Sequence, residues 1–124
     1  MATPEWSGRS IHFVGIGGAG MSGLALIALA LGADISGSDG SDSPVLDRLE
    51  NAGADVVVGH QAENVPPDAD VVWSSAIPDS NPELVAARER GQMLLHRSGL
   101  LAELTRLRRT IAVTGTHGKT TTSA

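Results

Sequence analysis

The sequence predicts an α/β protein whose core is a doubly wound, parallel sheet of five strands. Short apolar segments with the length of strands alternate with longer helical segments, and glycine or proline separates them. The chain contains two Trp, one Phe and no Tyr, so its core has to be built from Leu, Val, Ile and Ala. Such a core suits parallel strands buried under helices better than an antiparallel sandwich. With 124 residues, of which 41% are hydrophobic, the chain is long enough for one domain with a real core.

The five expected strands are residues 11–14, 34–37, 55–58, 70–73 and 93–95. Helices are expected over residues 21–31, 44–52 and 82–90, and along the apolar stripe Leu100, Leu101, Leu104 and Leu107. Ser43 and Asn81 each precede a proline, which is the pattern of an N-cap followed by proline at the first helical position. Gly32, Gly53 and Gly91 follow the first three helices and are expected to end them.

The formal net charge is −5, with seven acidic and two basic side chains in residues 1–60 and seven of each kind in residues 61–124. No basic patch suits a nucleic-acid backbone, so an anionic small ligand would have to be held by local backbone N–H groups. Cys is absent, which excludes disulfides and thiolate chemistry and agrees with a cytoplasmic protein. Residues 10–33 lack charged side chains, but glycines interrupt them, and neither a signal peptide nor a membrane span is expected.

The first motif is Gly15-x-Gly17-x-x-Gly20, placed between an expected strand and an expected helix. In this context the glycines allow a tight turn, the approach of a phosphate, and packing of helix on strand. Free N–H groups at the helix start favour a diphosphate. Asp39 follows at the distance where a Rossmann-like fold places its ribose-binding acid. The motif leaves the nucleotide open: NAD(H) is the default, a turn used only for packing is the structural alternative, and a solvated turn explains Asp39 equally well.

The second motif runs from Thr114 to Thr121, at the end of an expected sixth strand over residues 110–114. It ends in Gly-Lys-Thr, and its spacing is two residues shorter than that of the common phosphate-binding loop. Backbone N–H groups of such a loop surround phosphates, its Lys reaches the β- and γ-phosphates, and its Thr hydroxyl binds Mg²⁺. The expected ATP-binding residues are Gly115, Thr116, His117, Gly118, Lys119, Thr120 and Thr121.

Two adjacent nucleotide sites favour a ligase that joins an ATP-activated acid to a nucleophile. A dehydrogenase has no use for an ATP loop behind its cofactor domain, and a simple ATPase needs no Rossmann-like unit in front. The expected organisation is a disordered lead over residues 1–9 and a Rossmann-like nucleotide-binding domain over residues 10–109. Residues 110–124 are expected to supply the first strand and phosphate loop of a second, ATP-binding domain.

These motifs resemble those of the Mur ligases of peptidoglycan synthesis, over nearly the whole chain from Ile11 onward. The similar segments are the ATP loop 115–121, the opening 11–23, Ser36-Gly37-Ser38-Asp39, Gly59-His60, Ser74-Ser75-Ala76-Ile77 and Asn81-Pro82-Glu83. The resemblance implies three domains in a complete enzyme, which bind a UDP-sugar, ATP with Mg²⁺, and an amino acid. Residues 10–109 would then hold a UDP-sugar and not NAD.

The resemblance also implies roles for individual residues. The diphosphate would lie at the glycine turn, the uridine near Ser38 and Asp39, and the remaining residues at the carboxyl ends of strands, where ligands sit. A half-exposed loop position explains His60 as well as phosphate contact does. The implied UDP-sugar-binding residues are Gly15, Gly17, Gly18, Ala19, Gly20, Met21, Ser38, Asp39, His60, Ser75 and Ala76. Lys119 is the implied catalytic residue and Thr120 the implied Mg²⁺ ligand.

The opening segment is most similar to the family member that joins L-alanine to UDP-N-acetylmuramate. In that reaction ATP phosphorylates the lactyl carboxylate, the amine of L-alanine attacks the acyl phosphate, and phosphate leaves. Lys119 and Mg²⁺ would stabilise charge on the transferring phosphoryl group. The alternatives are the family member that recycles a murein tripeptide and an NAD-binding domain of a redox protein. This chain by itself is expected to bind UDP-N-acetylmuramate weakly and to have no ligase or ATPase activity.

Overall fold

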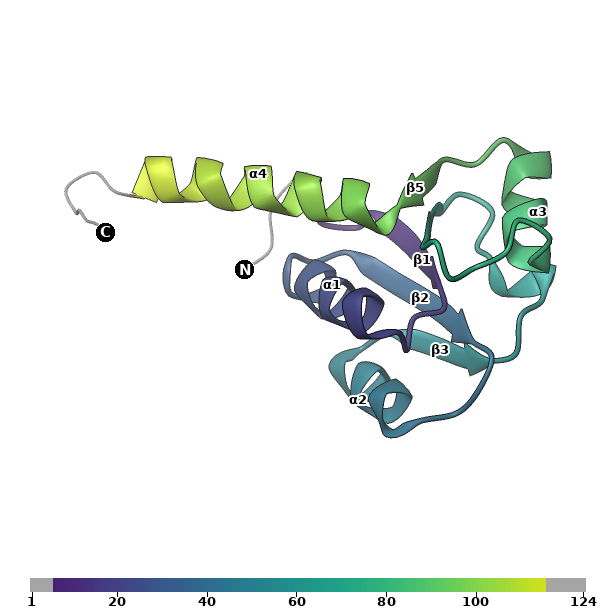
Figure 1. Ribbon diagram of the computed structural model, residues 1–124. Coiled ribbons are helices and arrows are strands. Elements are labelled where there is room, and N and C mark those ends of the chain that lie inside the picture. Colours follow the sequence, from purple (N-terminus) through teal and green to yellow (C-terminus); the bar gives the residue numbers. More distant parts are fainter. Residues whose placement is uncertain (1–5, 116–124) are drawn as a thin grey trace.

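The fold is that of a computed structural model of the chain, in which residues 6–115 are described (Figure 1). Strands and helices alternate along the chain, as the sequence predicts. In order they are β1 (Ser10–Val14), α1 (Ala19–Ala30), β2 (Asp34–Asp39), α2 (Pro44–Ala52), β3 (Asp55–Val58), η1 (Ala62–Asn64), β4 (Asp70–Trp73), α3 (Pro82–Arg90), β5 (Leu94–His96) and α4 (Arg97–Gly115). None of the helices in this described part is long and apolar enough to cross a membrane.

The five strands form one sheet in the order β3-β2-β1-β4-β5, and every pair is parallel. This confirms the predicted doubly wound α/β fold. The chain first builds outward from β1 through β2 to β3, and then restarts on the other side of β1 with β4. The direction of winding therefore reverses between β1 and β4, which is the position where open parallel sheets form a ligand-binding crevice.

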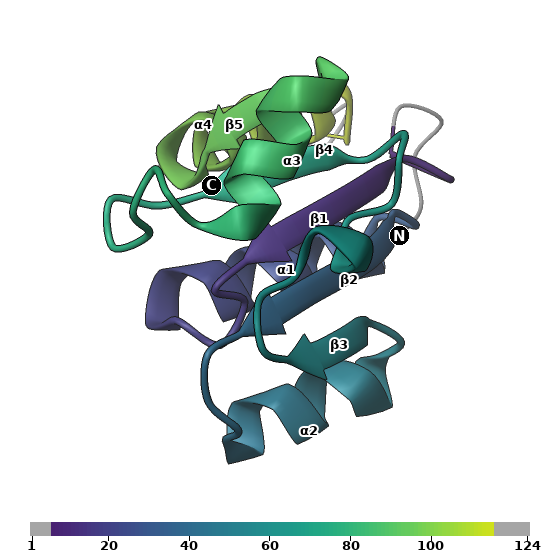
Figure 2. The same ribbon diagram turned by 90° about the vertical axis from the view of Figure 1, so that its right-hand side faces the viewer.

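Helices cover both faces of the sheet. In Figure 2, α3 and η1 lie in front of the sheet and α1 lies behind it. Side chains of β1 point alternately to the two faces of the sheet. Ile11 and Phe13 belong to the larger core under α1, α2 and α4, whereas Val14 belongs to the smaller core under α3. Full burial of the strand on both faces explains why its segment is apolar.

The helix ends agree with most of the predicted caps. Asn81 caps α3, because its side-chain oxygen accepts a hydrogen bond from Glu83 N at 2.9 Å. Gly53 and Gly91 end α2 and α3 in the left-handed conformation, with φ of 115° and 72°. Ser43 occupies the N-cap position of α2, but its side chain makes no capping hydrogen bond.

The predicted disordered lead is wrong for residues 6–9. Trp6 is buried in the main core, and the guanidinium of Arg9 lies 4.6 Å from the centre of the Trp6 ring. Arg9 also forms ion pairs with Asp70 and Glu103, each at 3.0 Å. Burial alone would lower the pKa of Arg9, but these hydrogen-bonded carboxylates raise it. The segment before β1 is therefore attached to β4 and α4.

The predicted strand over residues 110–114 is also wrong, because α4 continues through Gly115. A strand needs a neighbouring strand for its backbone hydrogen bonds, whereas a helix satisfies most of its own. Figure 1 shows α4 running past the end of the sheet, where no strand lies beside it among the described residues. Residues 116–124, with most of the predicted ATP loop, lie outside the described part of the chain. The proposed domain boundary stays a prediction.

A candidate anion site at the carboxyl edge of the sheet

The carboxyl ends of the five strands bring together residues that are far apart in the sequence. The glycine turn follows β1, Asp39 ends β2, and His60 follows β3. Ser75 and Ala76 follow β4, and Arg97 follows β5. The sequence predicted all of these for a ligand site except Arg97.

The glycine turn is held against β2 and against the loop after β4. Ser38 O accepts hydrogen bonds from the N–H groups of Gly15 and Ile16, at 2.8 and 2.9 Å. Gly15 has a φ of +79°, and a Cβ there would lie 2.9 Å from Ile77 Cδ1. A larger residue would therefore be strained in its backbone and would displace the loop. These contacts hold the turn against Ser38 and Ile77.

Most N–H groups of the turn are used within the protein. Gly17 N donates to Asp39 Oδ2 at 2.9 Å, and Gly18 N donates to Gly15 O at 3.1 Å. Gly18 O in turn accepts from Met21 N at 3.0 Å. The N–H groups of Ala19 and Gly20, by contrast, have no acceptor among the described residues, and both residues are exposed. These two groups at the start of α1 are available to an anion.

Arg97 supplies a positive charge beside these two N–H groups. Its Nη1 lies 3.1 Å from the position that a Cβ on Gly20 would occupy. Its side chain is exposed and has no hydrogen-bond or ion-pair partner within residues 6–115. A cation at the N-terminus of a helix is disfavoured by the helix dipole, so a bound anion would offset an unfavourable arrangement. A basic residue directly after the last strand was the available sequence signal for this position.

Asp39 connects the turn to the end of β2. Its Oδ1 accepts from Ser41 N at 3.2 Å, while Oδ2 is bonded to Gly17 N. Asp39 therefore stabilises the local turn, and its contact with a ribose stays a prediction. Strand β2 ends at Asp39, two residues later than predicted, because Ser38 pairs with Val14 and Val57.

A buried carboxylate, Glu83, lies beneath this edge between the sheet and α3. Glu83 is 0% exposed. Its Oε1 accepts from Ser38 Oγ and from His12 Nε2, both at 2.6 Å. Its Oε2 accepts from Asn64 Nδ2 at 2.8 Å and from Gln61 N at 3.1 Å. Four donors thus satisfy both oxygens of the carboxylate.

The environment of Glu83 favours the ionised form. Burial would raise its pKa, but the hydrogen bonds from His12, Ser38 and Asn64, with the charge interaction with His12, lower the pKa to about 2. Sequence reasoning noted Glu83 only as the residue after Asn81-Pro82, since a Glu in the first turn of a helix is ordinarily a solvated residue.

The other predicted residues, one within β2 and the others after β3 and β4, differ in their accessibility. Ser38 is fully buried, and its hydroxyl bonds to Glu83 and to His60 Nδ1, at 2.6 and 2.9 Å. The side chain of His60 is 22% exposed. Ser75 and Ala76 are exposed, and Ser75 Oγ lies 3.4 Å from His96 Nε2. Ser38 thus supports the site from inside, whereas the other three are open to solvent.

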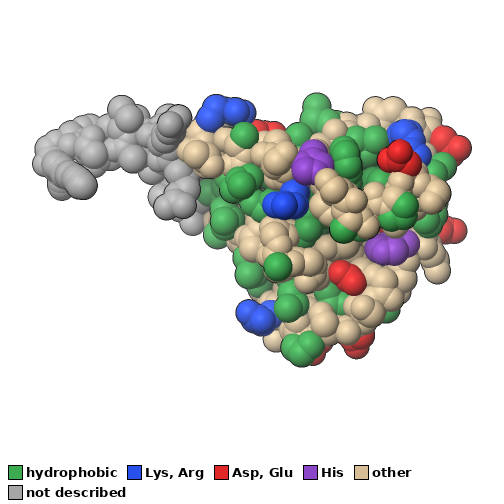
Figure 3. All heavy atoms as spheres, viewed as in Figure 1, with side chains coloured by type: hydrophobic (Ala, Val, Ile, Leu, Met, Phe, Trp, Pro, Cys, Tyr) green, Lys and Arg blue, Asp and Glu red, His purple; other side chains and the backbone are tan. Residues whose placement is uncertain are grey.

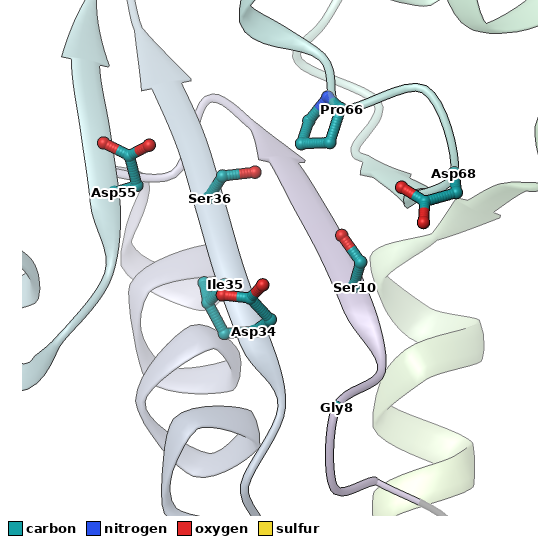
Figure 4. A pocket seen from close by; sticks show the side chains of 8 residues that line it. All are labelled: Gly8, Ser10, Asp34, Ile35, Ser36, Asp55, Pro66 and Asp68. Atoms are coloured by element: carbon teal, nitrogen blue, oxygen red, sulfur yellow. The ribbon is translucent and has the colours of Figure 1, made fainter.

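A pocket elsewhere on the sheet does not suit an anion. The pocket in Figure 4 has a volume of about 250 Å³ and is lined by Asp34, Asp55 and Asp68, together with residues of β1 and β2. It contains the first residues of β2 and β3, at the edge opposite the glycine turn. Three carboxylates would repel a diphosphate. No group of His, Asp and Glu that could hold a metal ion occurs in the described part of the chain.

The charged side chains visible on one face of the molecule form no basic patch among the described residues. On the face shown in Figure 3, basic, acidic and histidine side chains are scattered among hydrophobic and uncharged atoms. This distribution agrees with the net charge of −5. Binding of an anion at the glycine turn would therefore depend on local N–H groups and on Arg97.

A family model described as "Mur ligase family, catalytic domain" matches residues 10–109. The chain belongs to the Mur ligase family. The matched residues extend from the first strand of the sheet into α4 and include the whole carboxyl edge described above. The resemblance inferred from the sequence motifs is confirmed.

Three curated relatives carry the same name, UDP-N-acetylmuramate–L-alanine ligase. The UDP-N-acetylmuramate–L-alanine ligase of Jannaschia sp. is 59% identical over 114 residues, which are 92% of this chain and 24% of that protein. The ligase of the same name from Burkholderia ambifaria is 52% identical over 116 residues, 94% of this chain and 25% of that protein. The chain thus spans about a quarter of the length of the curated relatives that it matches.

Solved structures of two Mur ligases have the same fold. The UDP-N-acetylmuramate-alanine ligase of Thermotoga maritima matches with a TM-score of 0.67 and 34% identity, over 90% of this chain and 26% of that one. The murein peptide ligase of Psychrobacter arcticus matches with a TM-score of 0.72 and 32% identity, over 77% of this chain and 20% of that one. Both members of the family thus resemble this chain.

Proposed function

We propose that this chain is the UDP-N-acetylmuramate-binding part of an ATP-dependent ligase that joins L-alanine to UDP-N-acetylmuramate in the cytoplasm. The binding proposal depends on one observation: the N–H groups of Ala19 and Gly20, and the nearby Arg97 side chain, have no partner among the described residues. A diphosphate placed there would accept two hydrogen bonds and form one ion pair. The names of the curated relatives support the choice of substrate.

The remaining predicted residues fit a nucleotide that extends from this point. Asp39 lies next to the turn, where it would contact the ribose, and His60 lies beyond it at the end of β3. Ser75 and Ala76 directly precede Ile77, whose side chain lies against Gly15, and there they would meet the sugar. The NAD alternative uses the same turn, so the choice between the two rests on the family and on the experiment below.

The catalytic half of the proposal rests on the sequence motif over residues 115–121. ATP and Mg²⁺ would supply the phosphoryl group that activates the lactyl carboxylate, with Lys119 and the Thr120 hydroxyl as the groups that hold them. Residues 116–121 lie outside the described part of the chain. We expect the acceptor amine to be that of L-alanine, as in the names of the relatives.

A murein peptide ligase is the second candidate function. The structure of that enzyme from Psychrobacter arcticus has a TM-score of 0.72 to this chain. The carboxyl edge of the sheet supports a UDP-sugar or a related muramyl ligand with the same chemistry. The two candidates differ in the acceptor, which the resemblance assigns to a separate domain, so ligation of L-alanine or of murein tripeptide by the complete enzyme separates them.

The binding proposal is tested by isothermal titration of this chain with UDP-N-acetylmuramate, UDP, NADH and murein tripeptide. We expect both uridine nucleotides to bind, and Arg97→Gln to weaken them about tenfold, because a charge-assisted contact is worth roughly 1.5–3 kcal/mol when buried and less when exposed. The matched control is Arg48→Gln, which removes the same charge from an exposed position on α2 and is expected to leave binding unchanged.

Two results would contradict this proposal. Saturation by NADH without binding of either uridine nucleotide would favour the redox alternative. Equal losses of affinity for the uridine nucleotides in the Arg97 and Arg48 variants would show that binding depends only on net charge. The glycine turn would then not be the binding site.

A further inference from the structure

A chain of hydrogen bonds links the buried Glu83 to His60 through the hydroxyl of Ser38. An ionised carboxylate only accepts hydrogen bonds, so Ser38 must use its single proton in the 2.6 Å contact with Glu83 Oε1. Ser38 Oγ can then only accept in its 2.9 Å contact with His60 Nδ1. His60 must therefore carry a proton on Nδ1. In the neutral ring this leaves Nε2 as a hydrogen-bond acceptor.

The free nitrogen of His60 lies at the ligand edge. His60 Nε2 is 3.8 Å from the position of a Cβ on Gly40, the residue after Asp39. Its Nδ1 is directed inward to Ser38, with Glu83 Oε2 at 3.6 Å. The ring thus has one buried, bonded nitrogen and one nitrogen at the partly exposed end of β3.

The order of the strands indicates which part of a nucleotide reaches His60. Strands β1, β2 and β3 lie side by side, about 4.8 Å apart. Their carboxyl ends present the free N–H groups of the glycine turn, then Asp39, then His60. A nucleotide consists of phosphate, ribose and base in the same order. With the diphosphate at the turn, the nucleoside lies over β2 and β3.

We propose that Glu83 is a positioning residue that acts through Ser38 to keep the proton of His60 on Nδ1, so that Nε2 accepts a hydrogen bond from the nucleoside of the bound UDP-sugar. This inference rests on the proposed function. It assigns the nucleoside contact to an acceptor nitrogen and gives the buried Glu83 a role in recognition. Strand β2 carries a second serine–histidine contact, since Ser36 Oγ lies 2.8 Å from His12 Nδ1, whereas Ser38 Oγ contacts His60 Nδ1.

The tautomer of His60 is the first test. The chain has four histidines, and a long-range ¹H–¹⁵N spectrum distinguishes the two ring nitrogens of each. At a pH where its ring is neutral, His60 is expected to show a protonated Nδ1 and an unprotonated Nε2. Protonation of Nε2, the form that an unconstrained histidine prefers, would overturn the proposal without any variant.

Two matched substitutions test the route through Ser38. Ser38→Ala is expected to release His60 to the Nε2–H form and to weaken UDP binding about five- to tenfold. Ser36→Ala removes a hydroxyl from the same strand and the same network, and is expected to change neither. Identical effects of both variants on the His60 tautomer would overturn the proposal.

The variant His60→Asn tests the ligand contact and does not depend on the folding of the Ser38 variant. The Asn amide can still donate to Ser38 but has no counterpart of Nε2. UDP is expected to bind about five- to tenfold more weakly, while inorganic pyrophosphate binds equally well. Unchanged UDP affinity, or an equal loss for pyrophosphate, would contradict the nucleoside contact. Absence of UDP binding to the unmodified chain would instead remove the proposed function itself.

Discussion

Replacing Glu83 by Gln is expected to lower the free energy of unfolding by about 3 kcal/mol at neutral pH. Gln places an NH₂ group opposite two of the four donors that now face the carboxylate, and these donors stay buried. Chemical denaturation at pH 7 measures the loss. The control is Glu63→Gln, which neutralises an exposed carboxylate on η1 and is expected to change stability by less than about 0.5 kcal/mol.

The loss in this variant also depends on pH in a defined direction. The pKa of Glu83 is lowered from 4.5 to about 2, so the folded state favours the ionised form by roughly 3 kcal/mol. This contribution is complete above about pH 4.5 and disappears as the pH falls towards 2. The difference in the free energy of unfolding between the unmodified chain and Glu83→Gln should therefore shrink as the pH falls from about 4.5 towards 2. A stability difference between the two proteins that is absent at pH 7, or that stays constant down to pH 2, would contradict the claim that Glu83 is buried and ionised.

Replacing Gly37 by Ala is expected to destabilise the fold by about 3 kcal/mol or more. A Cβ at this position of β2 would lie 2.5 Å from Ile16 Cδ1, 2.7 Å from Ile16 Cβ and 2.9 Å from Phe13 O. Relief of these contacts requires movement of β1 or of the glycine turn that contains Ile16. The variant should therefore also bind UDP poorly at temperatures where it is still folded.

The matched control for this change is Gly23→Ala on α1. A Cβ there meets no atom within 4 Å, and the residue is exposed within the helix. Ala is favoured over Gly inside a helix, so this variant is expected to gain about 0.5–1 kcal/mol. Thermal unfolding measures both changes. A Gly37 variant as stable as the unmodified chain would show that the turn does not pack against β2 as described.

The parallel sheet and its glycine turn were predictable because their signals are local. Apolar segments of strand length, helical stripes and glycine ends determined the element order, and the crossover rule left few arrangements. The strand predicted over residues 110–114 was wrong because strand propensity acts only where a neighbouring strand is available. Its residues continue α4 in the structure.

The parts of the site that the sequence missed depend on contacts between distant residues. Arg97 reaches Gly20 only because the sheet places β5 two strands away from the central β1, with β4 between them. Glu83 appears in the sequence as an ordinary residue of a first helical turn, and only the tertiary structure buries it against His12 and Ser38. Similarly, Trp6 and Arg9 are fixed by partners far along the chain.

The central claim is that the diphosphate of a UDP-sugar binds at the start of α1. The most direct test follows backbone amide signals of the ¹⁵N-labelled chain during titration with UDP-N-acetylmuramate. We predict the largest shifts at Ala19 and Gly20, the N–H groups without an acceptor within residues 6–115, accompanied by a shift of the Arg97 side chain. Shifts confined to the amino-terminal edge around Asp34 and Asp55, or no shifts at saturating ligand, would contradict it.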